Sequence, residues 1–329
     1  MSSALLLIEW FELLSAYFSG AGLTQNTIIH LHEEAYIGAI AQFAKTLNAR
    51  QINNFIMWRV ANNYIHELGW EYLHINRIWA IIKYDGYVTF VGHYVWCMDF
   101  EIKGHLNFLL DYLYINSYFK ETSLSQAKQI FKDIKEAYIN RVKSWSWMDG
   151  PTKAKAVKKL QTSRDKVGFP DWLADADAVN KYYTNLKIVP NKHLENMITI
   201  YNFDRLALVA QLQKVYVDPN DWPDNVFDFT AYYSPTWHSI FFPAGLLQHP
   251  LYDYRIPAYI NYGSLGSWGG YVINEVVDTY GRWWDENGTY VSGSWWSKKT
   301  TDNFNKNVKP CNGNLYQGAK LCLNSTYCP

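Results

Sequence analysis

The sequence has no excess charge of either sign and few charged residues. Among its 329 residues, 30 Lys and Arg balance 30 Asp and Glu, so the formal net charge is zero, and charged residues make up only 18%. A neutral chain has no general electrostatic attraction for nucleic acid, so we expect no nucleic-acid partner. Hydrophobic residues make up 49%, which excludes intrinsic disorder. The length allows one large domain or two smaller ones around a real core.

Long hydrophobic runs are missing as well. No stretch approaches the roughly 18 uninterrupted apolar residues of a membrane-spanning helix, so no transmembrane segment is expected. The first residues, 1–12, contain no basic residue, and Glu9 and Glu12 lie beside their apolar run. This pattern is a poor signal peptide, so we expect neither a leader nor an anchor in this chain.

Cysteine is scarce and unevenly placed. Cys97 stands alone, whereas the other three lie near the C-terminus: Cys311, Cys322 and Cys328. Three cysteines cannot all pair with one another, so one of them is free, joined to Cys97 or linked to another chain. Two glycosylation sequons, at Asn287 and Asn324, lie in the same part of the chain. Together with the clustered cysteines, they favour an oxidising, extracellular location, either secreted or at the cell surface.

Apolar residues at helical spacing dominate the first two thirds of the sequence. This periodicity predicts helices over 35–49, 52–68, 105–119, from Ser123 onward, and over 152–160. Ser123 is expected to begin its helix as an N-terminal cap. The last of these helices is expected to present a solvated face of four lysines: Lys153, Lys155, Lys158 and Lys159.

Composition changes after residues 167–171, where Pro, Asp and Asn become frequent. Alternating aromatic residues then predict a β-hairpin, with strands over 226–233 and 240–242 and a turn around Pro235. We therefore predict a helical lobe over 1–195 and a mixed lobe over 196–329.

Motifs for common catalytic chemistry are absent. The helix of a zinc hydrolase needs two His at i and i+4 with a Glu beside the first. Both His66-Glu67 and His32-Glu33 lack the second His, and the pair His30 and His32 is more typical of surface residues than of metal ligands. The sequence has no phosphate-binding loop, dinucleotide fingerprint or serine-hydrolase elbow. Nothing identifies a partner that would make Cys97 a nucleophile.

Six short motifs nevertheless occur in order along nearly the whole chain. They are Met57-Trp58-Arg59, Trp147-Met148-Asp149, Val167–Asp171, Ala231–Pro235, Ile240–Gln248 and Ile260–Gly263. Together they resemble the neprilysin and endothelin-converting-enzyme family of zinc endopeptidases. The resemblance implies an extracellular, mainly α, two-lobed fold: a helical lobe and a partial thermolysin-like lobe with a small β-hairpin.

The same resemblance matches the family's zinc-binding segment to residues 270–282, on a helix expected to contain Leu265 to Val277. The first zinc-ligating His is matched by Tyr271, the general-base Glu by Val272 and the second His by Glu275. The flanking positions keep the family pattern: Gly270, Asp278, Gly281 and Arg282. Tyrosine is a poor neutral zinc ligand, and valine cannot accept a proton from water. We therefore expect no bound zinc and no catalytic residue here, with Tyr271 and Glu275 on one face of a helix.

Other family features are also altered. The resemblance implies a third zinc ligand, a Glu, and a transition-state His that would both lie past Pro329. The family's substrate-backbone motif is matched by Thr230-Ala231-Tyr232-Tyr233, and these four residues are our candidates for the substrate cleft. Thr230 stands in place of an Asn and offers a hydroxyl group rather than an amide. In the family, the cysteine matched by Cys97 pairs with an upstream cysteine, and no Cys precedes Cys97 here.

These substitutions lead us to expect a protein that is not an enzyme. It would be an inactive relative without a cofactor, acting extracellularly as a binding or scaffold protein for a peptide or protein partner, including other family members. One alternative is a zinc endopeptidase that cleaves oligopeptides, present here as a fragment or with unrecognised ligands. Another is a non-zinc activity in the same cleft. Four aromatic residues are consistent with core packing, a peptide groove or an interface: Tyr232, Tyr233, Trp237 and Phe241.

Overall fold

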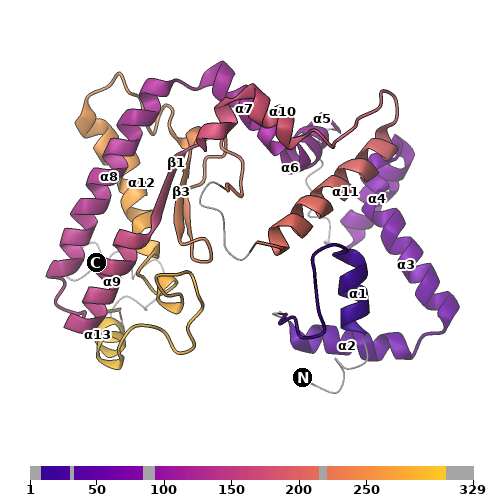
Figure 1. The fold of residues 1–329 in the computed structure, drawn as a ribbon, viewed down its shortest axis with the longest axis horizontal. Helices are drawn as coiled ribbons and strands as arrows, with labels where there is room; N and C mark the ends of the chain where they lie inside the picture. The colour runs from indigo at the N-terminus through magenta and orange to yellow at the C-terminus, as the bar shows by residue number, and fades with distance from the viewer. Residues whose placement is uncertain (1–8, 30–32, 84–92, 215–220, 309–329) are drawn as a thin grey trace. The chain divides into compact units, whose positions relative to one another are not determined.

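The structure is a computed structural model that describes residues 9–29, 33–83, 93–214 and 221–308 (Figure 1). Helices account for most of these residues, which confirms the predicted mainly α fold class. None of the helices in the described ranges has the length and hydropathy needed to cross a bilayer.

The described part of the chain divides into two compact units. The first holds the described residues of Met1–Leu106 and Asn180–Asp218, and the second those of Asn107–Val179 and Pro219–Pro329. The predicted boundary between residues 195 and 196 falls inside α11 (His193–Leu212). Because α11 contacts η2 (Ile65–Glu67) and α6 (Lys103–His105), it lies wholly within the first unit. The units are therefore interleaved in sequence rather than divided at one point.

The first unit contains helices and no strand in its described residues. Its elements are α1 (Trp10–Tyr17), α2 (Glu34–Lys45), α3 (Ala49–Asn63), η2, α4 (Trp70–Lys83), α5 (His93–Trp96), η3 (Cys97–Ile102), α6 and α11. The two helices predicted over 35–49 and 52–68 are present as α2 and α3. Asn48 separates them, because its side chain accepts a hydrogen bond from the Gln51 backbone N–H at 2.9 Å and caps α3.

The second unit combines helices with a small sheet. Its elements are α7 (Asn107–Tyr118), α8 (Glu121–Ser144), α9 (Gly150–Thr162), β1 (Arg164–Gly168), η4 (Asp171–Ala174), β2 (Tyr232–Ser234), β3 (Ser239–Pro243), η5 (Ala244–Leu246), α12 (Ala258–Glu275), η6 (Gly281–Trp283) and α13 (Lys298–Val308). Helix α10 (Ala176–Tyr182) contains the point where the chain passes from this unit to the first.

The predicted hairpin is confirmed, although its first strand is shorter than expected. Strands β2 and β3 pair antiparallel, with Tyr233 opposite Ile240, and residues 226–231 are not part of the strand. Strand β1 was not predicted. It pairs parallel with β3, with Val167 opposite Phe242, which gives the strand order β1-β3-β2.

Helices α8 and α12 pack with the sheet around the main core of the second unit (Figure 1). Ile240 and Phe242 of β3 join Phe131 of α8 in this core. Phe241 points to the opposite face, since successive side chains of a strand alternate. There its ring contacts Trp222 and Tyr232, with ring centroids 5.5 Å and 5.1 Å away.

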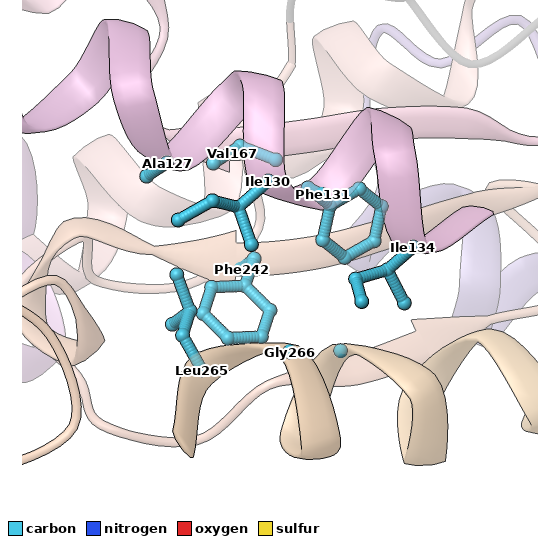
Figure 2. Close-up of a pocket in the computed structure, with 9 residues that line it drawn as sticks. Ala127, Ile130, Phe131, Ile134, Val167, Phe242, Leu265 and Gly266 are labelled. Carbon is cyan, nitrogen blue, oxygen red and sulfur yellow. The ribbon is translucent and has the colours of Figure 1, made fainter. Parts of the chain in front are cut away.

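Gly266 allows α12 to approach α8 closely. Figure 2 shows side chains of α8 facing Leu265 and Gly266 of α12 across a small apolar space. That space leaves no room for a water molecule. A Cβ on Gly266 would lie 3.1 Å from Ile134 Cδ1, closer than an ordinary contact, whereas one on Gly269 would lie at an ordinary 3.6 Å from the Phe131 ring. This packing fixes α12 in place, and with it the positions 271, 272 and 275.

One expected helix start is wrong. Helix α8 begins at Glu121, and Ser123 is buried inside its first turn instead of capping it. The side-chain cap belongs to the next helix, where Asp149 accepts a hydrogen bond from the Thr152 backbone N–H at 2.9 Å. Asp149 is the last residue of one of the family motifs, so that motif begins a helix.

The expected solvated face of α9 is also wrong at one position. Lys155 and Lys158 are exposed, but only 2% of Lys159 is accessible. Lys159 lies between Ala156 and Leu160 on the buried side of the helix, since residues three and four apart share a face. Its burial brings a cationic group beside the hairpin.

Candidate functional site

Three positions on the last two turns of α12 carry the side chains that the resemblance singled out. Tyr271 is 65% exposed, Glu275 is half-buried, and Val272 is fully buried among core residues. The expected sharing of one face by Tyr271 and Glu275 is confirmed, because both lie on α12, four residues apart. On the neighbouring face, Asn274 accepts a hydrogen bond from the Tyr138 hydroxyl of α8 at 2.5 Å.

Glu275 connects α12 to the hairpin. Its Oε2 atom accepts a hydrogen bond from the backbone N–H of Tyr233 in β2, with an N–O distance of 3.1 Å. Burial raises the pKa of the Glu275 carboxyl, and the nearby Asp278 raises it further. The Tyr233 N–H acts in the opposite direction, because it favours the charged carboxylate.

The four candidate cleft residues lie at and before β2. Thr230 is exposed and Ala231 is buried, whereas Tyr232 and Tyr233 form the start of the strand. Tyr233 is only 3% accessible, so its side chain fills the core. The Tyr232 side chain lies on the opposite face, where its hydroxyl donates a hydrogen bond to Asp224.

A cavity of about 210 Å³ adjoins the Tyr232 side of the hairpin. Its lining includes Thr230, Tyr232 and Phe241 together with two carboxylates, Asp224 and Asp228. It therefore combines an aromatic wall with negative charge beside two of the predicted cleft residues.

The turn that follows α12 is built around Asp278 and Gly281. The Asp278 Oδ1 atom accepts hydrogen bonds from the backbone N–H groups of Tyr280 and Gly281, at 2.8 Å and 3.0 Å. The Gly281 carbonyl in turn accepts a hydrogen bond from Lys159 Nζ at 2.5 Å. Burial lowers the pKa of Lys159 to about 7, with Asp278 acting in the opposite direction.

His238 lies behind β2, in the turn of the hairpin. Its Nδ1 atom is 3.0 Å from the Tyr233 hydroxyl, and its Nε2 atom is 3.0 Å from Thr162 Oγ1. Burial lowers the pKa of His238 to about 4, and the positive charge of Lys159 lowers it further. The imidazole is therefore neutral at pH 7 and holds the hairpin through both ring nitrogens.

Sequence reasoning missed Lys159 and His238. The spacing of Lys159 could have indicated its burial. It stands three residues after Ala156 and four before Ser163, both of which are buried, and residues at this spacing share a helix face. No local pattern marks His238, because both of its side-chain partners come from the folded hairpin and from α9.

The remaining predicted residues lie apart from this cluster or outside the described residues. Asn287 is exposed in a turn, as a glycosylation acceptor must be. Cys97 is half-buried in η3 of the first unit. The other predicted disulfide and glycosylation residues, and one histidine pair, lie outside the described ranges: Cys311, Cys322, Cys328, Asn324, His30 and His32.

The side chains at the family's zinc positions do not fit a zinc ion. A catalytic zinc takes about three protein ligands and a water molecule. Here Val272 offers no donor, Tyr271 offers a neutral phenol, and the Glu275 carboxylate is already bonded to Tyr233. Within the described ranges, no three His, Cys, Asp or Glu side chains gather in an arrangement that could hold a metal.

Comparison with known proteins supplies the family. Models described as peptidase family M13 match residues 3–170 and 230–324. The chain belongs to peptidase family M13. Endothelin-converting enzyme 1 of Rattus norvegicus is 25% identical over 333 residues, which cover 96% of this chain and 43% of that enzyme. Neprilysin-3 of Drosophila melanogaster is 28% identical over 276 residues, which cover 82% of this chain and 34% of that protein.

A solved structure of the same kind supports the fold. The zinc metalloprotease Zmp1 of Mycobacterium tuberculosis, crystallised with an inhibitor, matches with a TM-score of 0.73 at 21% identity. The match covers 91% of this chain and 45% of that one. This M13 chain therefore spans less than half the length of the relatives it matches, and it has their fold over that part.

Family membership contradicts the expectation that this protein is not an enzyme. The matched models are those of a peptidase family, and the relatives are named as converting enzymes and metalloproteases. The expectation was drawn from three side chains on one helix. Such a local donor set does not decide the activity of a whole protein, and the matched region is less than half of each relative.

Proposed function

We propose that this M13 chain binds extended oligopeptides along the outward edge of β2, as the peptide-holding part of a peptidase-family protein. The direction of the Tyr233 backbone N–H carries the proposal. That N–H points to Glu275 of α12 and away from β3, so β2 keeps a backbone edge on the side of α12.

The antiparallel register explains this direction. Residues directly opposite each other alternate between pairs that exchange both backbone hydrogen bonds and pairs that exchange none. Because the Tyr233 N–H is bonded to Glu275, Tyr233 and Ile240 form a pair of the second kind. The N–H and the C=O of Tyr233 then lie on the same outward side. Among the described strands, only β3 pairs with β2, which leaves this edge for an added strand.

The neighbouring cavity supports the same proposal. A peptide strand paired with β2 alternates its side chains between the two faces of the sheet. On the Tyr232 face, the cavity of about 210 Å³ has room for one such side chain. Its carboxylates, Asp224 and Asp228, favour a basic one.

We further propose that α12 holds no zinc ion in this chain. The proposal rests on the donor set at positions 271, 272 and 275, which supplies one carboxylate where a zinc helix supplies two imidazoles and a general base. No step of peptide recognition at β2 depends on a metal.

The purified protein is expected to bind a fluorescein-labelled pool of random-sequence peptides in a saturable way. The same pool with N-methyl groups on every backbone nitrogen is expected to bind about tenfold more weakly, because it cannot donate to the Tyr233 carbonyl. Fluorescence anisotropy measures both affinities, and hydrolysis of the pool is followed in parallel. Equal affinity for the two pools would rule out strand pairing. The zinc proposal would be contradicted if the purified protein bound one zinc ion per chain and the Glu275→Ala variant bound none.

We also propose an extracellular location, for which the exposed turn at Asn287 provides a test. Asn287-Gly288-Thr289 is expected to carry an N-linked glycan when the protein is produced in a secretory host. Treatment with an N-glycosidase should then lower the mass of the fragment containing Asn287, and the Thr289→Ala variant should lack this change. An unmodified Asn287 in secreted protein would count against the assignment. Association with other family members stays a prediction.

A further inference from the structure

We infer that the Glu275 side chain is a competitor of peptides for the outward edge of β2. It blocks this edge until a peptide displaces it. The inference rests on the proposed peptide binding at β2 and adds a residue that regulates it. Its physical basis is that one backbone donor has two acceptors competing for it.

The contested donor is the Tyr233 N–H. In the structure, Glu275 Oε2 accepts it at an N–O distance of 3.1 Å. A peptide strand added to β2 would place one of its own backbone carbonyls at this position, because paired strands satisfy each other's outward N–H groups. A single N–H does not bond fully to both. The Glu275 side chain must therefore swing away before a peptide pairs with Tyr233.

The position of Glu275 is not explained by helix preference. It is the last residue of α12, and a carboxylate at a helix C-terminus is unfavourable in the field of the helix dipole. Asp278 lies in the next turn and adds like charge. The hydrogen bond from the Tyr233 N–H offsets these costs, and the nearby Tyr271 side chain also favours the charged carboxylate. The carboxylate is thus held at the strand edge by the backbone N–H that it blocks.

Tyr271 lies beside Glu275 on the solvent side and favours its charged form. It lies one helical turn before Glu275 and is 65% exposed. A peptide arriving at β2 would meet the Tyr271 ring and the Glu275 carboxylate together.

Two substitutions of Glu275 separate the effect of its hydrogen-bond acceptor from the effect of its negative charge. Glu275→Ala removes the acceptor and is expected to raise affinity for the random peptide pool about threefold to tenfold. Glu275→Gln keeps an acceptor oxygen in a side chain of the same size, so its affinity is expected to stay within about twofold of the unchanged protein. Thermal unfolding of all three proteins confirms that each is folded.

Amide hydrogen exchange gives a second readout that needs no peptide. The fragment containing Tyr233 is expected to exchange faster in Glu275→Ala than in the unchanged protein, whereas Glu275→Gln should retain its protection. Unchanged exchange in Glu275→Ala would show that the N–H is not held by Glu275 in solution.

The outcomes distinguish the inference from the proposal beneath it. If the unmethylated pool binds better than the N-methylated pool, but Glu275→Ala gains no affinity, the competitor role is wrong and peptide binding at β2 stands. An equal gain in Glu275→Ala and Glu275→Gln would also overturn it, because charge alone would then explain the effect. If no variant binds either pool, peptide binding at β2 is wrong, and the inference falls with it.

Discussion

Replacement of Gly245 by alanine is expected to destabilise the second unit by more than about 4 kcal/mol or to prevent its folding. A Cβ on Gly245 would lie 2.1 Å from the Phe227 carbonyl oxygen and 2.4 Å from that of Asp228. Both are backbone atoms, so no side-chain rotation relieves the overlap. The Gly245 N–H also donates to the Val226 carbonyl at 2.8 Å, which ties this backbone to the segment that it faces.

A matched glycine elsewhere in the same core should behave in the opposite way. A Cβ on Gly269 in α12 would meet the Phe131 ring at 3.6 Å, which is an ordinary contact. Because alanine favours a helix interior over glycine by about 1 kcal/mol, Gly269→Ala is expected to stabilise the unit slightly. Urea unfolding followed by circular dichroism compares the two variants. Gly245→Ala unfolding at the same midpoint as the unchanged protein would show that the close approach to Phe227 is incorrect.

The motifs that carried the family resemblance largely stabilise the fold. Gly245 belongs to the most specific of them, and its role is the close backbone contact just described. In another motif, Asp149 caps α9, while the neighbouring Met148 is 2% accessible in the core. These residues identify the family because the fold needs them. They say little about chemistry. This explains why the absence of enzymatic activity, inferred from positions on one helix, was wrong while the family was right.

Local periodicity predicted the helices and the hairpin well. The α7, α8 and α9 helices and the β2–β3 pairing lie where apolar spacing or aromatic alternation placed them, and α12 lies where the family resemblance placed a helix. Strand β1 was missed because Arg164–Gly168 has no alternating pattern. It is a strand because β3 provides a parallel partner that is distant in sequence, and because Lys135 of α8 pairs with Asp165 at 2.7 Å.

The site itself depends on contacts that no local pattern encodes. The Glu275 carboxylate meets the Tyr233 N–H across 42 residues of sequence. Lys159 reaches the Gly281 carbonyl across 122 residues. The sequence identified Glu275 and Tyr233 separately, through the resemblance, but their hydrogen bond arises only when α12 packs beside the hairpin. Interleaved units were likewise unpredictable from composition, since α11 rejoins the first unit through tertiary contacts.

Acidification is expected to weaken the second unit through His238. Burial lowers the pKa of this imidazole from 6.5 to about 4 in the folded protein. Below about pH 6.5 the unfolded chain binds a proton at His238, whereas the folded protein binds it only near pH 4. The unfolded state therefore holds more protons in this window, and stability falls as the pH falls through it. The loss is about 3 kcal/mol when complete.

Charged groups around His238 also act on the pKa of its imidazole. Lys159 and Arg164 oppose a positive imidazole, as does Lys135, and Asp285 favours it. Burial also raises the pKa of two carboxyl groups of the same unit, Asp278 and Asp165. Their contribution has the opposite sign, so the stability of the unchanged protein alone does not isolate His238.

A comparison with His238→Asn isolates the imidazole. His238 has a backbone φ of 45°, in the left-handed region that asparagine tolerates better than most residues. At pH 7 the variant is expected to be less stable by about 1–3 kcal/mol, because it loses the contacts to Tyr233 and Thr162. As the pH is lowered to 4, that difference should shrink by about 2–3 kcal/mol, since only the unchanged protein carries the histidine. Urea unfolding followed by tryptophan fluorescence at four pH values measures it. A constant difference would mean that the imidazole is not held neutral behind β2, and that the hairpin edge offered to peptides is supported in another way.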